Sequence, residues 1–201
     1  MRGIWAAALN PFNDDLSLDE AGLRANIRHW IDDLDIEGLF IAGKQGEFFS
    51  MSLDERKRNF EIAVEECAGK AGVIVSVSDQ NFDTVRELSR YAQDCGADYI
   101  VVHAPVLSFV HERGEVLYQY YKALCDELDI GIAIFDPKSA LSGYLREKLD
   151  ISKEAIYNAI AESKSLEEMT TTEGGAAAAE DDYAAAIDHW SRILLIDPDH
   201  E

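Results

Sequence analysis

Five short groups of polar residues follow apolar runs in this sequence, and their residue types could bind or transform a small ligand. The groups are Asn10-Pro11-Phe12, Gly43-Lys44-Gln45-Gly46-Glu47, Ser78-Asp79-Gln80-Asn81, His103-Ala104-Pro105 and Phe135-Asp136-Pro137. The second group is the most specific of these. Glycines that flank polar residues after a strand can present backbone N–H groups and side-chain donors to an anion. This group therefore predicts a site for a carboxylate.

Each single candidate also has a plain structural explanation. Lys44 could act as a reactive amine, but position alone does not lower the pKa of a lysine. A solvated lysine, or one paired with Glu47, is therefore the favoured interpretation. His103 could face a site at the end of its strand, although a hydrogen-bonded histidine is the commoner outcome. Glu47 and Asp136 form an acid/base pair only if the fold brings them together.

The elements that must position these groups alternate between short apolar runs and longer amphipathic ones. Apolar runs predict strands within 4–12, 37–50, 71–79, 97–106 and 130–137. Amphipathic segments predict helices at 17–34, 52–69, 81–96, 114–129 and 151–162. The spacing between strands is about 30 residues, as in a βαβ unit. Their consecutive apolar residues suit a parallel sheet that is covered on both faces.

This alternation predicts an α/β fold with a parallel sheet, either open and doubly wound or rolled into a (β/α)8 barrel. A complete barrel needs about 250 residues, so about five units give an incomplete one. Two of the expected helices begin with capping-box spacing, in which Ser17 precedes Glu20 and Ser52 precedes Glu55. We therefore expect helix N-caps at Ser17 and Ser52.

The character of the sequence changes after residue 147. Residues 148–201 hold 13 acidic and four basic side chains, and 170–182 is a low-complexity linker. The segment 182–200 predicts an amphipathic helix that weakly resembles a helix of a tetratricopeptide repeat. The alternative is a helix that covers apolar surface of the β/α units. We expect no further strand in this acidic helical tail.

Composition excludes several classes of partner. The chain has 39 acidic and 18 basic residues, for a net charge of −21, which argues against nucleic acids and anionic membranes. The three cysteines are odd in number and far apart, which favours reduced thiols in a cytoplasmic protein. Asp79, Asn81 and His111 lack the spacing of a metal site, so we expect neither a metal nor another cofactor.

Several of these motifs, taken in order, resemble the dihydrodipicolinate synthase / N-acetylneuraminate lyase family. That family's first strand typically ends in Thr-Pro-Phe, where this chain has Asn10-Pro11-Phe12. Its second strand ends in Gly-Thr-Thr-Gly-Glu, where this chain has 43–47, and a Ser/Thr-x-Glu-Glu-Arg helix start follows, as at 52–56. The family is also similar at the entry to the fourth expected strand, which is Cys95-Gly96-Ala97-Asp98 here, and at Pro105 at the end of that strand.

The resemblance covers about residues 1–147 and implies a partial barrel of (β/α)8 type. Family members are lyases and aldolases that form a Schiff base between a lysine and a 2-oxo acid such as pyruvate. The resemblance implies that Lys44 and Gln45 replace the threonine pair that binds the carboxylate, with Asn10 beside them. It also places Phe135 or Asp136 where the family has a proton-relaying tyrosine.

The family's Schiff-base lysine belongs at the end of the sixth strand, in an apolar run. The lysines after the fifth expected strand are Lys138, Lys148, Lys153 and Lys164. None of them lies in such a run, so the catalytic lysine is expected to be missing. An imine requires an uncharged amine, which a desolvated lysine supplies.

Two functions follow from these observations. The first is a family member that binds a 2-oxo acid and has little or no lyase activity by itself. The second is a non-enzymatic module that assembles with another copy or with a complementary half-barrel. Exposed edges at the first and fifth expected strands would carry that assembly.

Overall fold

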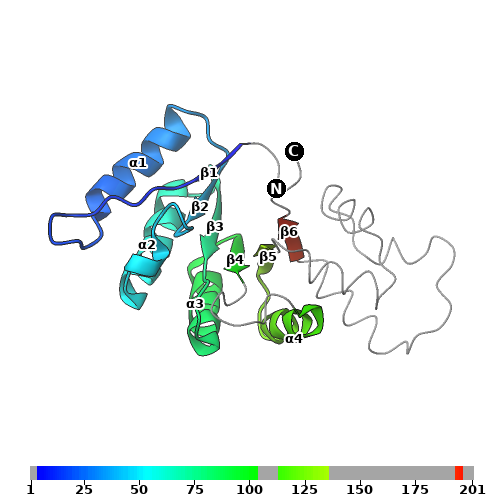
Figure 1. Ribbon diagram of the computed structural model, residues 1–201. Coiled ribbons are helices and arrows are strands. Elements are labelled where there is room, and N and C mark those ends of the chain that lie inside the picture. The colour runs from blue at the N-terminus through cyan, green and yellow to red at the C-terminus, as the bar shows by residue number, and fades with distance from the viewer. Residues whose placement is uncertain (1–3, 104–112, 136–192, 197–201) are drawn as a thin grey trace, which may run out of the picture. The chain divides into compact units, whose positions relative to one another are not determined.

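The computed structural model describes residues 4–103, 113–135 and 193–196 (Figure 1). The chain divides into two compact units, Met1–Val102 and His103–Glu201, which are described here separately. None of the helices within the described residues is both long and apolar enough to cross a membrane.

The first unit alternates strands and helices in the predicted order. Its elements are β1 (Trp5–Ala7), α1 (Glu20–Asp32), β2 (Gly38–Ile41), the 3-10 helix η1 (Phe48–Ser50), α2 (Leu53–Cys67), β3 (Gly72–Ser76), α3 (Phe82–Cys95) and β4 (Tyr99–His103). The strands β1, β2, β3 and β4 are parallel and neighbour one another in that order. The prediction of parallel β/α units is therefore confirmed, although each strand is shorter than its apolar run.

One face of this sheet forms the core together with the helices. Alternate residues of a strand point to opposite faces, and one set is almost completely buried: Leu39, Ile41, Val73, Val75, Ile100 and Val102. Helix residues that are also fully buried are Leu23, Ile27, Phe60, Ile62 and Leu88. Burial of such side chains contributes about 1.5–3 kcal/mol each, so this layer holds α1, α2 and α3 beside the strands.

The other set of alternate residues includes a large ring over two glycines. Trp5, Gly38 and Gly72 are register partners on β1, β2 and β3. A Cβ atom added to Gly38 would lie 2.2 Å from Trp5 Cδ2, and one added to Gly72 would lie 2.4 Å from Trp5 Cη2. The indole therefore lies across both neighbouring strands, in space that a side chain at either glycine would occupy.

The helix starts confirm one predicted cap and correct the other. Ser52 caps α2 in a complete capping box with Glu55, as predicted. Ser17 does not cap α1, because the chain stays non-helical for two more residues and the Ser17 hydroxyl donates to a nearby aspartate. Asp19 is the N-cap instead, and its carboxylate accepts from the Gly22 N–H at 2.9 Å.

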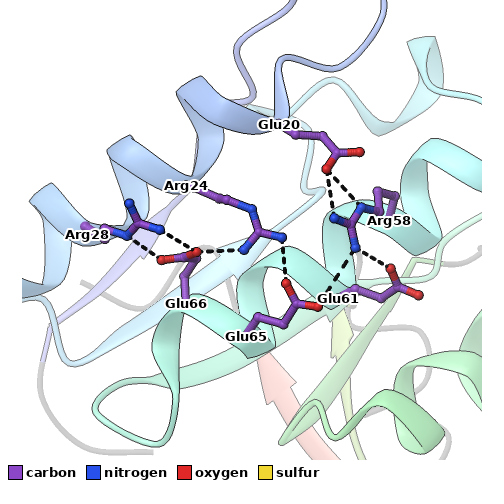
Figure 2. Close-up of polar contacts among 7 residues, drawn as sticks. All are labelled: Glu20, Arg24, Arg28, Arg58, Glu61, Glu65 and Glu66. Carbon is purple, nitrogen blue, oxygen red and sulfur yellow. Dashed lines mark hydrogen bonds and ion pairs between the residues drawn. The ribbon is translucent and has the colours of Figure 1, made fainter.

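Ion pairs join the exposed sides of α1 and α2 (Figure 2). Arg24 donates to Glu65 and Glu66, and Arg28 also donates to Glu66, each at 2.6 Å. Further along α2, Arg58 pairs with Glu20 of α1 at 2.8 Å. Three arginines thus neutralise part of a strongly acidic surface where the two helices meet.

The second unit contains α4 (Gly114–Cys125), β5 (Gly131–Phe135) and β6 (Ile193–Ile196). β6 is parallel to β5, and the register pairs Ile132 with Ile193 and Phe135 with Ile196. The prediction of a helix over 182–200 is therefore wrong at these four residues, as is the prediction that no strand follows residue 148. The run Ile-Leu-Leu-Ile is short, consecutive and partly β-branched, which suits a parallel strand. The helix expected at 151–162 and the linker at 170–182 lie outside the described residues.

Candidate functional site

The carboxyl ends of β1, β2 and β3 meet at one edge of the parallel sheet, because the three strands pair in register. Asn10 follows β1, the loop Gly43–Glu47 follows β2, and Asp79 follows β3. This is the edge at which β/α enzymes carry their reactive groups. The structure therefore brings three of the predicted polar groups to one edge of the first unit.

The loop Gly43–Glu47 separates its glycines from its polar side chains. Gly43 and Gly46 are buried, whereas Lys44, Gln45 and Glu47 are exposed. Glu47 adopts a left-handed conformation with φ of 54°, and its N–H donates to the Lys44 carbonyl at 3.1 Å. This turn places two donor-bearing side chains, an ammonium group and an amide, next to each other on the surface. Such a pair can bind a carboxylate.

Asn10 contacts the loop directly. Its Nδ2 donates to the Gly46 carbonyl at 2.6 Å and lies 3.3 Å from the Met51 sulfur. Its Oδ1 accepts from the side chain of Asn59, an α2 residue that is 0% exposed. The sequence placed Asn10 at the carboxylate site by resemblance, and the structure shows both ends of its amide hydrogen-bonded within the protein.

Arg56 is a second buried polar residue of α2 at this edge. Its Nη2 donates to the carbonyls of Ser76 and Ser78 at 3.1 and 3.0 Å, and its Nη1 lies 3.4 Å from Asp79 Oδ2. The guanidinium carbon lies 5.1 Å from the centroid of the Phe48 ring. Burial lowers the pKa of Arg56 to about 10, an effect that Asp79 opposes. Arg56 is thus a cation at neutral pH that binds the end of β3.

Sequence reasoning missed the structural roles of Arg56 and Asn59. The signal that could have found them is their spacing on α2, because Arg56, Asn59, Phe60 and Ala63 recur at helical intervals and therefore share one face. All four are buried. Polar residues within an otherwise apolar stripe indicate specific hydrogen bonds rather than a solvent-facing side.

The remaining predicted residues belong to the second unit or lie outside the described residues. His103 is the last residue of β4 and is half-buried. Phe135 is the last residue of β5, and Asp136 lies outside the described residues, so the pairing of Glu47 with Asp136 stays a prediction. In the part of the chain that the structure describes, there is no cluster of three histidine, cysteine or acidic side chains that could hold a metal ion.

Parallel β/α units whose strands pair in their sequence order, with polar residues at the strand ends, are typical of α/β proteins of the TIM-barrel type. The comparison with known families agrees with this class. The chain belongs to the dihydrodipicolinate synthetase family, whose model matches residues 1–139.

Individual relatives support the same assignment. The N-acetylneuraminate lyase of Clostridium perfringens is 36% identical over 135 residues, which cover 67% of this chain and 46% of that enzyme. The structure of N-acetylneuraminate lyase from Fusobacterium nucleatum superimposes with a TM-score of 0.67 at 30% identity, covering 75% of this chain and 54% of that one. A prophage protein of E. coli K12 from the dihydrodipicolinic acid synthase family, solved with pyruvate, gives 0.63 at 30% identity, with 70% and 46% covered. The chain spans about half the length of these relatives.

Proposed function

We propose that this chain binds the carboxylate of a small 2-oxo acid at the loop Gly43–Glu47. We further propose that the chain does not convert this ligand through a Schiff base. Family membership supports the ligand class, because related structures from E. coli K12 and Fusobacterium nucleatum were solved with pyruvate. The exposed donors Lys44 and Gln45, between two buried glycines at the strand ends, are the observation that carries the carboxylate site.

The proposed lack of turnover rests on the lysines of this chain. β6 pairs with β5 and follows it in the described residues, and Asp197-Pro198 comes after β6 rather than a lysine. Lys44, the lysine of the loop, is exposed, whereas a Schiff-base lysine is activated by desolvation. Without such an amine the 2-oxo acid would be held by its carboxylate and its carbonyl carbon would not be attacked.

Borohydride trapping with pyruvate, followed by intact-mass measurement, tests the absence of an imine. We expect no mass increase, and a reduced adduct would overturn this part of the proposal. An NMR titration with pyruvate tests binding, and we expect the amide signals of Lys44, Gln45 and Gly46 to move. A titration that moves none of these signals would overturn the carboxylate site.

Two matched variants distinguish specific binding at the loop from a nonspecific effect of the protein's charge. Lys44→Met should weaken pyruvate binding about tenfold, the effect of losing one charge-assisted hydrogen bond of about 1.4 kcal/mol. Lys70→Met removes an equally charged exposed lysine beyond α2, which pairs with Asp32, and should leave the affinity unchanged. Equal losses in both variants would indicate a nonspecific effect of charge.

Assembly of copies through the edge of β1 is a second candidate function, whereas the exposed edge expected at the fifth strand is covered by β6. Ile4 and Leu9, at either end of β1, are large apolar residues with 66% and 60% of their surface exposed. Among the described residues β1 is the terminal strand of its sheet, and a terminal strand with exposed apolar residues favours association. Sedimentation at increasing concentration should then show a dimer that Leu9→Lys weakens. A monomer at every concentration would exclude this function.

A further inference from the structure

A chain of amide hydrogen bonds links α2 to the loop Gly43–Glu47. Asn59 Nδ2 donates to Asn10 Oδ1 at 2.9 Å, and Asn10 Nδ2 donates to the Gly46 carbonyl at 2.6 Å. These bonds join residues that are 49 and 36 positions apart in the sequence. They therefore connect a helix, the segment after β1 and the loop after β2.

The Gly46 carbonyl sets the orientation of both amides. A carbonyl oxygen only accepts, so Asn10 must present Nδ2 to Gly46 and Oδ1 to Asn59. Asn59 must then present its own Nδ2. If either amide were turned over, two oxygens would face each other at hydrogen-bond distance. The chain of bonds therefore has a single direction, and it ends at the loop.

This orientation leaves the other end of Asn59 unsatisfied. Asn59 is 0% exposed, and within the described part of the chain its Oδ1 has no hydrogen-bond partner. A buried oxygen without a partner destabilises a fold, and an apolar residue of the same size would not carry that cost. Groups that are unfavourable for stability are typical of positions that serve function.

We propose that Asn59 is a positioning residue, which acts through Asn10 to hold Gly46 and so sets the places of Lys44 and Gln45. Both ends of the Asn10 amide are occupied, so Asn10 positions the loop rather than binding the carboxylate itself. The effect on a ligand rests on the proposed function. The positioning of the loop by Asn59 is independent of the proposed function.

The variant Asn59→Leu tests the link, because leucine matches asparagine in size but cannot donate. We expect the amide NMR signals of 43–47 to shift without any ligand, and the affinity for pyruvate to fall about tenfold, the effect of one lost hydrogen bond. We expect little change in the melting temperature, because the removal of the unsatisfied Asn59 oxygen offsets the donor that Asn10 Oδ1 loses. A purely structural residue would lower the melting temperature and leave the loop signals in place.

Asn59→Asp keeps the shape and replaces the donor with an acceptor that faces Asn10 Oδ1. This variant should shift the loop signals further than Asn59→Leu. The matched control is Asn26→Leu on α1, which should leave the signals of 43–47 and the affinity unchanged. If Asn59→Leu also leaves these signals unchanged, the proposal is overturned. Should Asn59→Leu not fold, Asn59→Ser decides the same question with a smaller side chain that is too short to reach Asn10.

A double variant tests whether Asn59 acts through Asn10. Asn10→Ala should weaken pyruvate binding at least as much as Asn59→Leu, and the double variant should bind no more weakly than Asn10→Ala alone. Losses that multiply would show that the two residues act independently and would overturn the relay. If the unaltered chain does not bind pyruvate, the proposed function fails, and the loop signals still decide the role of Asn59.

Discussion

Replacement of Arg56 by methionine should destabilise the fold strongly, although the guanidinium of this α2 residue contacts the end of β3 rather than the apolar core. Methionine retains most of the aliphatic volume and removes the guanidinium. The carbonyls of Ser76 and Ser78 then lose their donors, at 3.1 and 3.0 Å. These bonds lie in a buried environment, because Arg56 is only 3% exposed.

The magnitude follows from opposing contributions. A hydrogen bond to a charged group contributes about 1.5–3 kcal/mol, so two contribute about 3–6 kcal/mol. Removing a buried charge recovers part of this, because its desolvation is no longer required. The pair with Asp79 adds little, since the distance is 3.4 Å and a third of the Asp79 side chain is exposed. We expect a net loss of about 3 kcal/mol in the free energy of unfolding.

Urea unfolding followed by circular dichroism measures this loss. With a slope of about 1–3 kcal/mol per molar urea, the midpoint should fall by about 1–3 M. Arg90→Met, on the exposed side of α3, is the control and should change stability by less than about 0.5 kcal/mol. Asp79→Asn should cost much less than Arg56→Met. An Arg56→Met variant as stable as the unaltered chain would refute the reasoning, and an equal cost for Asp79→Asn would assign the effect to the ion pair.

Three further predictions concern the outer helices and a buried thiol. Hydrogen bonds from Arg28 and Arg24 hold the pKa of Glu66 below its ordinary 4.5. Its stabilising effect is therefore present above about that pH and is lost as the pH falls through the lowered value, and urea titrations should show a flatter acid profile for Glu66→Gln. Ser52→Ala removes the capping-box partner of Glu55 and should cost about 1 kcal/mol of unfolding free energy in the same assay. Burial raises the pKa of Cys67 to about 12, so a disulfide reagent at pH 8 should modify Cys67 only after urea unfolds the chain.

The alternation of apolar and amphipathic runs was sufficient to predict the β/α units, because their periodicity depends on burial alone. The ends of the strands could not be predicted in the same way. β2 ends at Ile41 within a longer apolar run, and Ala42 then adopts φ of 51°. A positive φ at an alanine is unusual, and no residue type in this apolar run predicts it.

The last described strand shows a second kind of limit. Four apolar residues fit one turn of an amphipathic helix as well as a short buried strand. For 193–196 the choice depends on β5, whose register offers backbone partners from Ile132 to Phe135. That information lies about 60 residues away in the sequence and becomes available only in the fold.

The candidate site was predictable where it follows a strand and not where it comes from a helix. The loop 43–47 could be recognised because glycines and polar residues directly follow an apolar run. Asn59 and Arg56 lie in the middle of α2, where polar residues usually face solvent. Only the three-dimensional register shows that they point to the strand ends, where they bond to Asn10 and to the end of β3.

The ring of Trp5 has a consequence for the order in which this unit can form. Its packing surface includes Gly38 and Gly72, so β1 cannot complete these contacts until the chain has reached β3. β1 is three residues long, and its backbone pairs with β2. Closing the long segment between Trp5 and Gly72 is entropically costly and slow, so we expect β1 to dock late in folding. The indole would report that step as a change in fluorescence.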